Sequence, residues 1–133
     1  FANHSYIKPV ESGTVPAILK DGELINIPQN IINGGVMWKY HPYLSGSVYA
    51  SWHDRIKSPI GTTSTTYEYD PDYEISAKTI LNLAVSAHDV YKGLELSFKI
   101  HNLFDERDYR GGTVRIPYPQ EGRNILFTVG YKF

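Results

Sequence analysis

The stretch that decides the fold is the last eleven residues, 123–133, which read RNILFTVGYKF. From its third position onward, every second residue is large and apolar: Ile125, Phe127, Val129, Tyr131 and Phe133. Successive side chains of a β-strand point to opposite faces, so these five share one face, and Asn124, Thr128, Gly130 and Lys132 share the other. A strand with lipid on one side and a wet lumen on the other needs this pattern, and an aromatic end suits a membrane interface. The stretch predicts a strand of a bacterial outer-membrane barrel.

Alternation of period two recurs along the chain, whereas the periodicity of an amphipathic helix is nowhere sustained. The clearest further case is residues 94–101, where we expect an outward-facing apolar set, Leu94, Leu96, Phe98 and Ile100, and an inward-facing polar set, Glu95, Ser97, Lys99 and His101. Similar strands are predicted over residues 32–40, 44–53 and 81–88, with a weaker one over residues 1–8. The sequence therefore predicts an all-β fold of six antiparallel transmembrane strands.

The predicted connections alternate between short and long. Residues 41–43 and 88–92 are predicted tight turns, and Gly93 closes the second of them. The other three connections are long, polar and rich in Gly or Pro, and they span about residues 9–22, 54–73 and 105–121. Outer-membrane barrels have short periplasmic turns and longer extracellular loops. We therefore expect the long connections to be extracellular and the C-terminus to be periplasmic.

Composition narrows the function. The chain has 133 residues, the size of one small domain, and its net charge of −1 argues against a nucleic-acid partner. No apolar run approaches the roughly 18 to 20 residues that a membrane-spanning helix needs, so strands would have to carry any membrane role. The chain begins at Phe1 with no signal peptide in view, and we expect a mature segment or a piece of something longer.

Two motifs resemble a known family. Residues 102–105, Asn-Leu-Phe-Asp, are followed by Tyr109, and residues 118–124, Tyr-Pro-Gln-Glu-Gly-Arg-Asn, lead into the terminal strand. Together they resemble the C-terminal signature of TonB-dependent outer-membrane receptors. The resemblance extends over essentially the whole chain and is strongest from residue 94 to residue 133. It implies that residues 1–133 are the C-terminal portion of the barrel.

In this family the barrel has about twenty-two strands and is filled by an N-terminal plug domain. The resemblance thus implies that the plug, the TonB box and the earlier strands lie before Phe1. Six strands would not close a membrane barrel alone, since single-chain barrels begin at about eight. We therefore expect the chain to form part of a larger wall.

The signature residues are predicted to be architectural rather than catalytic. Asn102 and Asp105 can bond neighbouring backbone where the strand leaves the sheet, and Leu103 and Phe104 can pack at the rim. We expect Gly122 to supply a backbone geometry that other residues resist, and Arg123 to bridge to Asp105. The aromatic ending resembles the signal read by the barrel assembly machinery, which the resemblance assigns to Phe127, Val129, Tyr131 and Phe133.

Enzyme chemistry finds little support. The five histidines lack metal-ligand spacing, and His53-Asp54 beside several serines has no nucleophile motif around it. Alternate carboxylates in residues 67–74 suit Ca²⁺, but the EF-hand pattern is absent, and a solvated loop or a contact surface is favoured. We predict no catalytic residues, no metal and no cofactor. The predicted ligand contacts in the long connections are Tyr67, Tyr69, Tyr73, Arg107, Arg110 and Arg115, of which the arginines would meet an anionic ligand such as a ferric siderophore.

The resemblance implies an active-transport receptor that takes up a scarce ligand, most often an iron chelate, with energy delivered through TonB. Its implied partners are outer-membrane lipid, the rest of the barrel and plug, TonB, the barrel assembly machinery and a small-molecule ligand. An alternative of a different class stays open: a passive pore, or a structural or adhesin-type surface barrel, without a plug. A plug and a TonB box in the preceding sequence would distinguish the two.

Overall fold

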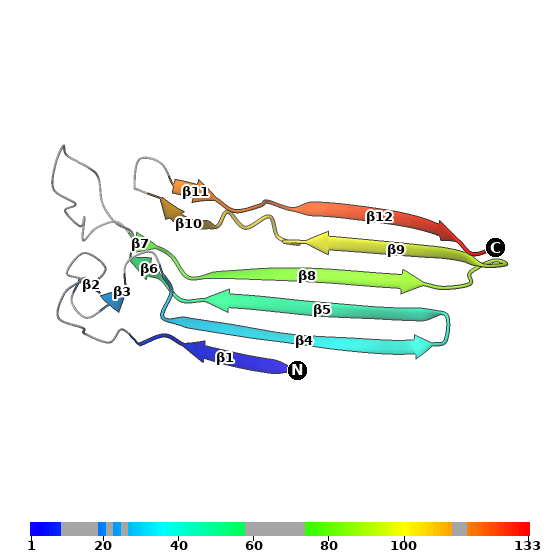
Figure 1. The fold of residues 1–133 in the computed structure, drawn as a ribbon, viewed down its shortest axis with the longest axis horizontal. Coiled ribbons are helices and arrows are strands. Elements are labelled where there is room, and N and C mark those ends of the chain that lie inside the picture. Colours follow the sequence, from blue (N-terminus) through cyan, green and yellow to red (C-terminus); the bar gives the residue numbers. More distant parts are fainter. Residues whose placement is uncertain (9–18, 21–22, 25–26, 58–73, 113–116) are drawn as a thin grey trace.

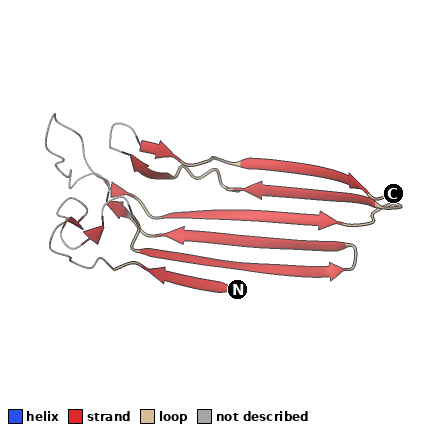
Figure 2. Ribbon diagram, viewed as in Figure 1, coloured by secondary structure: helices blue, strands red, loops and turns tan. Residues whose placement is uncertain are grey.

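The computed structural model describes residues 1–8, 19–20, 23–24, 27–57, 74–112 and 117–133. Six long strands form one sheet in the order of the sequence, and each is antiparallel to its neighbours (Figure 1). They are β1 (Ala2–Tyr6), β4 (Asn30–His41), β5 (Leu44–His53), β8 (Lys78–Ala87), β9 (Leu94–His101) and β12 (Asn124–Tyr131). The described part contains strands and loops but no helix (Figure 2). The prediction of six antiparallel strands in an all-β fold is confirmed.

The register of the sheet separates two kinds of side chain. One row of directly opposite residues crosses five strands and is apolar throughout: Ile125, Ile100, Leu83, Val48 and Val36. A second row across the same strands is polar throughout: Thr128, Ser97, Ser86, Ser45 and Lys39. Directly opposite residues lie on the same face of a sheet, so the sheet has an apolar face and a polar face. The two sets expected to separate along β9 do so.

Apolar and polar side chains separate less strictly between the two faces than the sequence alternation predicts. Leu126 pairs with Lys99 and Met37 pairs with Ser47, which places both apolar residues on the polar face. They stand at opposite ends of one cross-strand row, and Met37 is 76% exposed. The alternation of a β-strand fixes which face a side chain lies on, but not which residue type stands there. A strand therefore keeps its register when one position on the polar face is apolar.

The two ends of the sheet differ. The β4–β5 turn, the β8–β9 turn and the C-terminus lie together at one end, which we call the turn end (Figure 1). At the other end, three short antiparallel pairs extend the connections, where the sequence predicted only loops. These pairs are β2 (Leu19–Lys20) with β3 (Glu23–Leu24), β6 (Ile56–Lys57) with β7 (Glu74–Ile75), and β10 (Tyr109–Gly112) with β11 (Pro117–Pro119).

The β6–β7 pair shows why the loop prediction was incomplete. Ile56 and Ile75 are directly opposite and both are buried, with Ile56 fully inaccessible. Two β-branched residues in one cross-strand pair stabilise a short ladder that neither segment would form alone. The partners are nineteen residues apart in sequence, so a local pattern does not reveal the pairing.

No helix of sufficient length and apolar character to cross a membrane occurs among the described residues. Within the same residues, β1 and β12 each pair on one side only, so the sheet has two open edges. An open edge presents a row of unpaired backbone N–H and C=O groups.

The β8–β9 turn depends on Gly93. Its φ is +89°, its amide donates to Asp89 Oδ1 at 2.6 Å, and its carbonyl accepts from the Lys132 amide at 2.9 Å. A Cβ at this position would collide with the Lys132 carbonyl oxygen. Backbone conformation and space therefore both exclude a larger residue, and the turn is joined directly to the end of the chain.

We predict that Gly93→Ala lowers the free energy of unfolding of the intact protein by about 2 kcal/mol, since it adds left-handed strain to a backbone collision. Gly130→Ala is the matched control, because its Cβ would meet only Glu95 at ordinary contact distance, 3.7 Å. Denaturant titration of both variants checks the prediction. Equal losses would show that the turn does not need glycine.

Candidate functional site

A pocket of about 420 Å³ opens on the polar face, where the segments on either side of the β10–β11 pair fold over the sheet. Its floor comes from β5, β8 and β9, and its wall comes from the connection between β9 and β12. Its lining residues are Tyr49, Ser51, Ile80, Asn82, His101, Asp108, Gln120 and Glu121. The lining combines neutral polar groups with two carboxylates and one histidine. It suits hydrogen bonding rather than covalent chemistry.

Two of the floor residues are held in fixed orientations. The Tyr49 hydroxyl donates to Asn33 Oδ1 at 2.8 Å, and Asn82 Oδ1 accepts from the Asn102 amide at 2.9 Å. His101 is exposed at the margin of the pocket. The orientations of Tyr49 and Asn82 are therefore set by neighbouring strands before any molecule enters.

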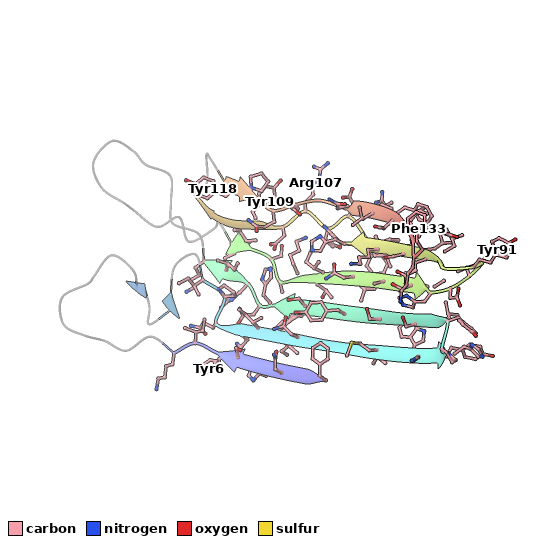
Figure 3. The ribbon with its side chains drawn as sticks, turned by 45° about the vertical axis from the view of Figure 1, so that its right-hand side comes forward. Tyr6, Tyr91, Arg107, Tyr109, Tyr118 and Phe133 are labelled. Carbon is pink, nitrogen blue, oxygen red and sulfur yellow. The ribbon has the colours of Figure 1, made fainter. Side chains whose placement is uncertain are left out.

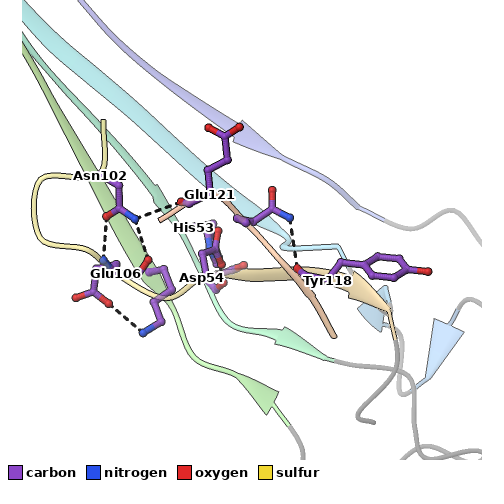
Figure 4. A network of polar contacts seen from close by, with 9 residues as sticks. His53, Asp54, Asn102, Glu106, Tyr118 and Glu121 are labelled. Atoms are coloured by element: carbon purple, nitrogen blue, oxygen red, sulfur yellow. Dashed lines mark hydrogen bonds and ion pairs between the residues drawn. The ribbon is translucent and has the colours of Figure 1, made fainter. Parts of the chain in front are cut away.

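Asn102 anchors the connection where β9 ends. Its side chain is 1% exposed, and its φ of +53° turns the chain away from the sheet. Nδ2 donates to the carbonyls of Glu106 at 2.9 Å and Glu121 at 3.5 Å, while Oδ1 accepts from the Glu106 amide at 2.9 Å (Figure 4). One amide side chain thus holds the segment just after β9 and the segment just before β12. Asparagine tolerates the left-handed backbone that this position requires.

Asp105, Gly122 and Arg123 meet, but not as the sequence suggested. The Arg123 backbone amide donates to Asp105 Oδ1 at 2.8 Å, in place of the expected bridge from the guanidinium. Gly122 has no left-handed φ; a Cβ there would instead come 3.1 Å from Asp105 Oδ1. Within the signature, the described residues with a left-handed φ are Asn102 and Asp105. Close approach, rather than unusual backbone geometry, explains the glycine.

The other two signature residues are Leu103, whose backbone joins the sheet, and Phe104, whose side chain is exposed. The Leu103 amide donates to the Leu81 carbonyl at 2.8 Å, which extends the β8–β9 ladder by one bond. Phe104 is 67% exposed, so the described residues do not supply the rim packing that was expected for it.

A second anchor joins the connection to β5. His53 Nε2 lies 3.2 Å from Asp108 Oδ1, and these two residues are among the most buried polar residues described, at 1% and 4% exposure. His53 Nδ1 lies 2.8 Å from the Asp54 carbonyl oxygen. The Asp108 carbonyl in turn accepts from the Gln120 amide at 2.9 Å. The segments before β10 and after β11 are therefore fixed to β5 of the sheet through Asp108.

Further polar contacts lead from this anchor to the other edge of the sheet. Asp54 Oδ2 accepts from the Asn30 backbone amide at 3.0 Å and from Asn30 Nδ2 at 2.7 Å, and Asn30 Oδ1 lies 3.0 Å from His4 Nε2. The polar contacts thus run from β1 through β4 and β5 to the last connection. The end of the sheet opposite the turn end is tied together across its width.

The predicted ligand contacts are only partly placed. Tyr67, Tyr69, Tyr73 and Arg115 lie outside the described residues, and for Arg110 only the backbone, in β10, is described. Arg107 is exposed between β9 and β10, and its side chain projects away from the sheet (Figure 3). The described part therefore does not bring this predicted set together. The residues that it does bring together are those of the pocket and its two anchors.

The predicted assembly residues all lie on or just after β12. Phe127 and Val129 are opposite Phe98 and Leu96 on the apolar face, with exposures of 61% and 58%. The rings of Tyr131 and Phe133 meet edge to face, with centroids 5.0 Å apart, beside the β8–β9 turn. This contact joins the last two aromatic positions of the alternation.

Sequence reasoning missed the His53–Asp108 contact. The two residues are fifty-five positions apart, and neither stands in a recognisable motif. The only available signal was a histidine at the end of a strand, directly followed by an aspartate. Among the described residues, no group of three or more histidine, cysteine, aspartate or glutamate side chains could hold a metal ion.

Comparison with known proteins bears on the fold. No protein-family model and no curated protein matches the chain. Among solved structures, the chain is similar to a mutant of the ferric enterobactin receptor from Pseudomonas aeruginosa, with a TM-score of 0.57 and 24% sequence identity. The match covers 80% of this chain and 16% of that chain, so the chain spans about a sixth of the receptor's length. At this identity the likeness establishes the fold alone.

Proposed function

We propose that the chain is the C-terminal part of the barrel of a TonB-dependent outer-membrane receptor. The observation that carries the proposal is the register of the sheet, which sorts apolar from polar side chains across five strands. A lipid-facing outer surface and a wet lumen require this separation in every strand of the wall. The similarity in fold to a ferric enterobactin receptor and the signature motifs support the same family.

The apolar face supports a lipid partner. Val36, Ile125, Phe127 and Val129 are each between 58% and 66% exposed. A continuous apolar surface of this kind is rare on a soluble monomer and needs a cover. Lipid covers such a face without demanding shape complementarity, whereas a packed protein partner would demand it.

The open edges of the sheet support the presence of further barrel strands, and the polar face supports a plug domain. The unpaired backbone groups of β1 and β12 would be costly in hydrocarbon, and further barrel strands would satisfy them. Leu126 and Met37 expose apolar surface on the polar face, which packing against a plug domain would bury.

Aromatic residues at both ends of the sheet support a sheet that spans a membrane. Tyr40, Tyr43, Tyr131 and Phe133 are exposed at or near the turn end, and Trp52 lies near the opposite end of β5. Outer-membrane barrels carry aromatic girdles at both interfaces. Such barrels also have short periplasmic turns and longer extracellular loops, so we infer that the turn end lies in the periplasm and that the long connections lie outside the cell.

The transported ligand in this proposal is an iron chelate such as a ferric siderophore, and TonB supplies the energy. The test is uptake of ferric enterobactin labelled with radioactive iron, by iron-starved cells whose only uptake receptor is the full-length protein. Accumulation that is lost when TonB is inactivated supports the proposal. Accumulation that continues without TonB supports the passive pore, and absence of uptake by correctly inserted protein excludes this ligand.

Capture of an anionic chelate should depend on charge in the last connection. Replacing Arg107, Arg110 and Arg115 together with glutamine is expected to slow association with ferric enterobactin about ten-fold at low salt and to weaken its salt dependence. Exposed charges steer encounter more than they hold the bound state, so the dissociation rate should change little. Binding kinetics at two ionic strengths provide the measurement.

The matched control for this variant replaces Lys39, Lys92 and Lys132 with glutamine. It removes the same charge near the turn end, which in the proposed orientation faces the periplasm. It should leave association unchanged. If the two triple variants behaved alike, the arginines would act only through net charge.

The aromatic ending should matter for assembly. We expect deletion of Phe133 to lower the amount of full-length receptor in the outer membrane far more than deletion of Thr113, which lies outside the described residues. The reason is that Phe133 completes the alternating aromatic pattern that resembles the assembly signal. Quantitative surface labelling compares the two, and equal surface levels would contradict the assignment.

A further inference from the structure

Trp38 packs on Gly46 across the β4–β5 strand pair. The two residues are directly opposite on the apolar face, next to the Val36–Val48 pair. A Cβ at Gly46 would collide with Cζ2 of the indole and would lie 2.6 Å from its Cε2. The ring therefore occupies the space that a side chain on β5 would fill, and only glycine leaves that space open.

The same hairpin contains a β-bulge close to this contact. Lys39 is opposite Ser45, but His41 is opposite Leu44, so the register shifts by one residue between these two pairs. Tyr40 is the extra residue of the bulge, and it is 83% exposed. Because only two residues join β4 to β5, the bulge is needed to bring the apolar residues of both strands to one face.

A second register of this hairpin would also keep every side chain on its own face. With a five-residue loop, residues 39–43, and no bulge, Trp38 would be opposite Leu44 and Val36 would be opposite Gly46. Loops of this length are common in hairpins. Such a register moves β4 by two residues along β5, which preserves the alternation. Hydrophobic patterning therefore does not decide between the bulged and the shifted register.

Side-chain volume does distinguish the two registers. Opposite Leu44, the indole would meet a side chain where Gly46 has none, so its apolar contact with β5 would be lost. Trp38 and Gly46 are eight residues apart, whereas the Asn30–Asp54 bonds at the other end of the strand pair join residues twenty-four apart. A shorter loop closes at a lower entropic cost, so the contact near the turn forms first.

The register of β4 and β5 also determines the pocket floor. The Tyr49 hydroxyl of β5 donates to Asn33 Oδ1 of β4 at 2.8 Å, and Asp54 Oδ2 accepts from the Asn30 side chain at 2.7 Å. A shift of β4 by two residues would change the separation of both pairs. The pairing selected near the turn therefore places polar groups at the far end of the same strands.

We propose that Trp38 and Gly46 form a register lock, in which packing of the indole on glycine selects the bulged pairing of β4 with β5 as the hairpin forms. Trp38 is thereby a positioning residue for the pocket floor, although it lies on the opposite face of the sheet. This goes beyond the uptake proposal, because it concerns the pairing of two strands and is read without transport.

Two double-cysteine forms of the full-length protein report the register, after replacement of any other cysteines. Gly35 exchanges both backbone bonds with Phe1 of the neighbouring chain segment. Met37, two residues further along β4, also directs its backbone groups away from β5, so its pair with Ser47 is of the closer, non-hydrogen-bonded kind. Met37→Cys with Ser47→Cys therefore cross-links the bulged register, and Met37→Cys with Ser45→Cys cross-links the shifted one.

Each form is refolded into vesicles and oxidised, and the remaining thiols are counted by maleimide labelling and mass spectrometry. We expect the bulged cross-link to predominate when Trp38 and Gly46 are both present. Gly46→Ala should lower the ratio of the bulged to the shifted cross-link about ten-fold, which corresponds to about 1.4 kcal/mol. Gly34→Ala is the matched control on the same face, because its Cβ would lie 3.7 Å from the nearest atom, and it should leave the ratio unchanged.

Trp38→Val tests whether the indole is responsible. It should lower the ratio as Gly46→Ala does, and the two changes together should lower it no further than either one alone, since both remove the same contact. An unchanged ratio in Gly46→Ala or Trp38→Val would overturn the lock. So would an equal fall in Gly34→Ala, or additive falls in the double variant.

Discussion

Val129→Arg is expected to lower the free energy of unfolding of the full-length receptor in a bilayer by about 2–4 kcal/mol, whereas Thr128→Arg should cost about 1 kcal/mol or less. Val129 lies opposite Leu96 on the apolar face, and Thr128 lies opposite Ser97 on the polar face. The two positions are adjacent on one strand, so their depth in the membrane is nearly the same. The difference in cost therefore reports the face rather than the depth.

Denaturant titration of the two variants, refolded into vesicles of the same lipid, gives the measurement. If Thr128→Arg were the more destabilising of the two, the faces would be reversed. Small and equal losses would place the apolar face in contact with something other than hydrocarbon, because an exposed surface arginine changes stability little.

Asn102→Ala should destabilise the receptor by about 3 kcal/mol, in two separable parts. Loss of a buried amide leaves the Glu106 amide and carbonyl without their partners, which costs about 2 kcal/mol. Alanine at a φ of +53° adds about 1 kcal/mol of backbone strain. Asn102→Gly removes the strain and keeps the loss of hydrogen bonds, so it should cost about 1 kcal/mol less than alanine.

Arg107→Ala provides the control for this series, because the residue lies in the same connection but is exposed. It should change the free energy of unfolding by less than about 0.5 kcal/mol. Equal stability of Asn102→Ala and Arg107→Ala would mean that the connection does not depend on this anchor.

The sheet could be predicted from the sequence because the residue pattern that specifies each strand is local. The alternation in residues 94–101 and 123–133 fixes which side chains share a face, and the cross-strand pairs Phe98–Phe127 and Leu96–Val129 then follow from antiparallel pairing. Strand ends were less accurate. β8 begins at Lys78, three residues before the predicted start, because the pairing of Lys78 with His53 extends a ladder that alternation alone does not mark.

The site was less predictable because its information is not local. The His53–Asp108 contact joins residues fifty-five positions apart, and the Asn102 side chain bonds the backbone of Glu121 nineteen residues on. The motif at residues 102–105 located the anchor, but not the identity of its partners. The roles of Tyr67, Tyr69, Tyr73 and Arg115 as ligand contacts stay predictions, since these residues lie outside the described ranges.

The central claim is that one face of this sheet meets lipid and the other meets a wet lumen. Spin labels placed one at a time along β12, from residue 124 to residue 131 of the full-length protein in vesicles, test it most directly. Collision rates with oxygen, which concentrates in lipid, should peak at residues 125, 127 and 129. Those with a water-soluble nickel complex should peak at residues 124 and 128. Rates without this alternation, or with the opposite parity, would contradict the account.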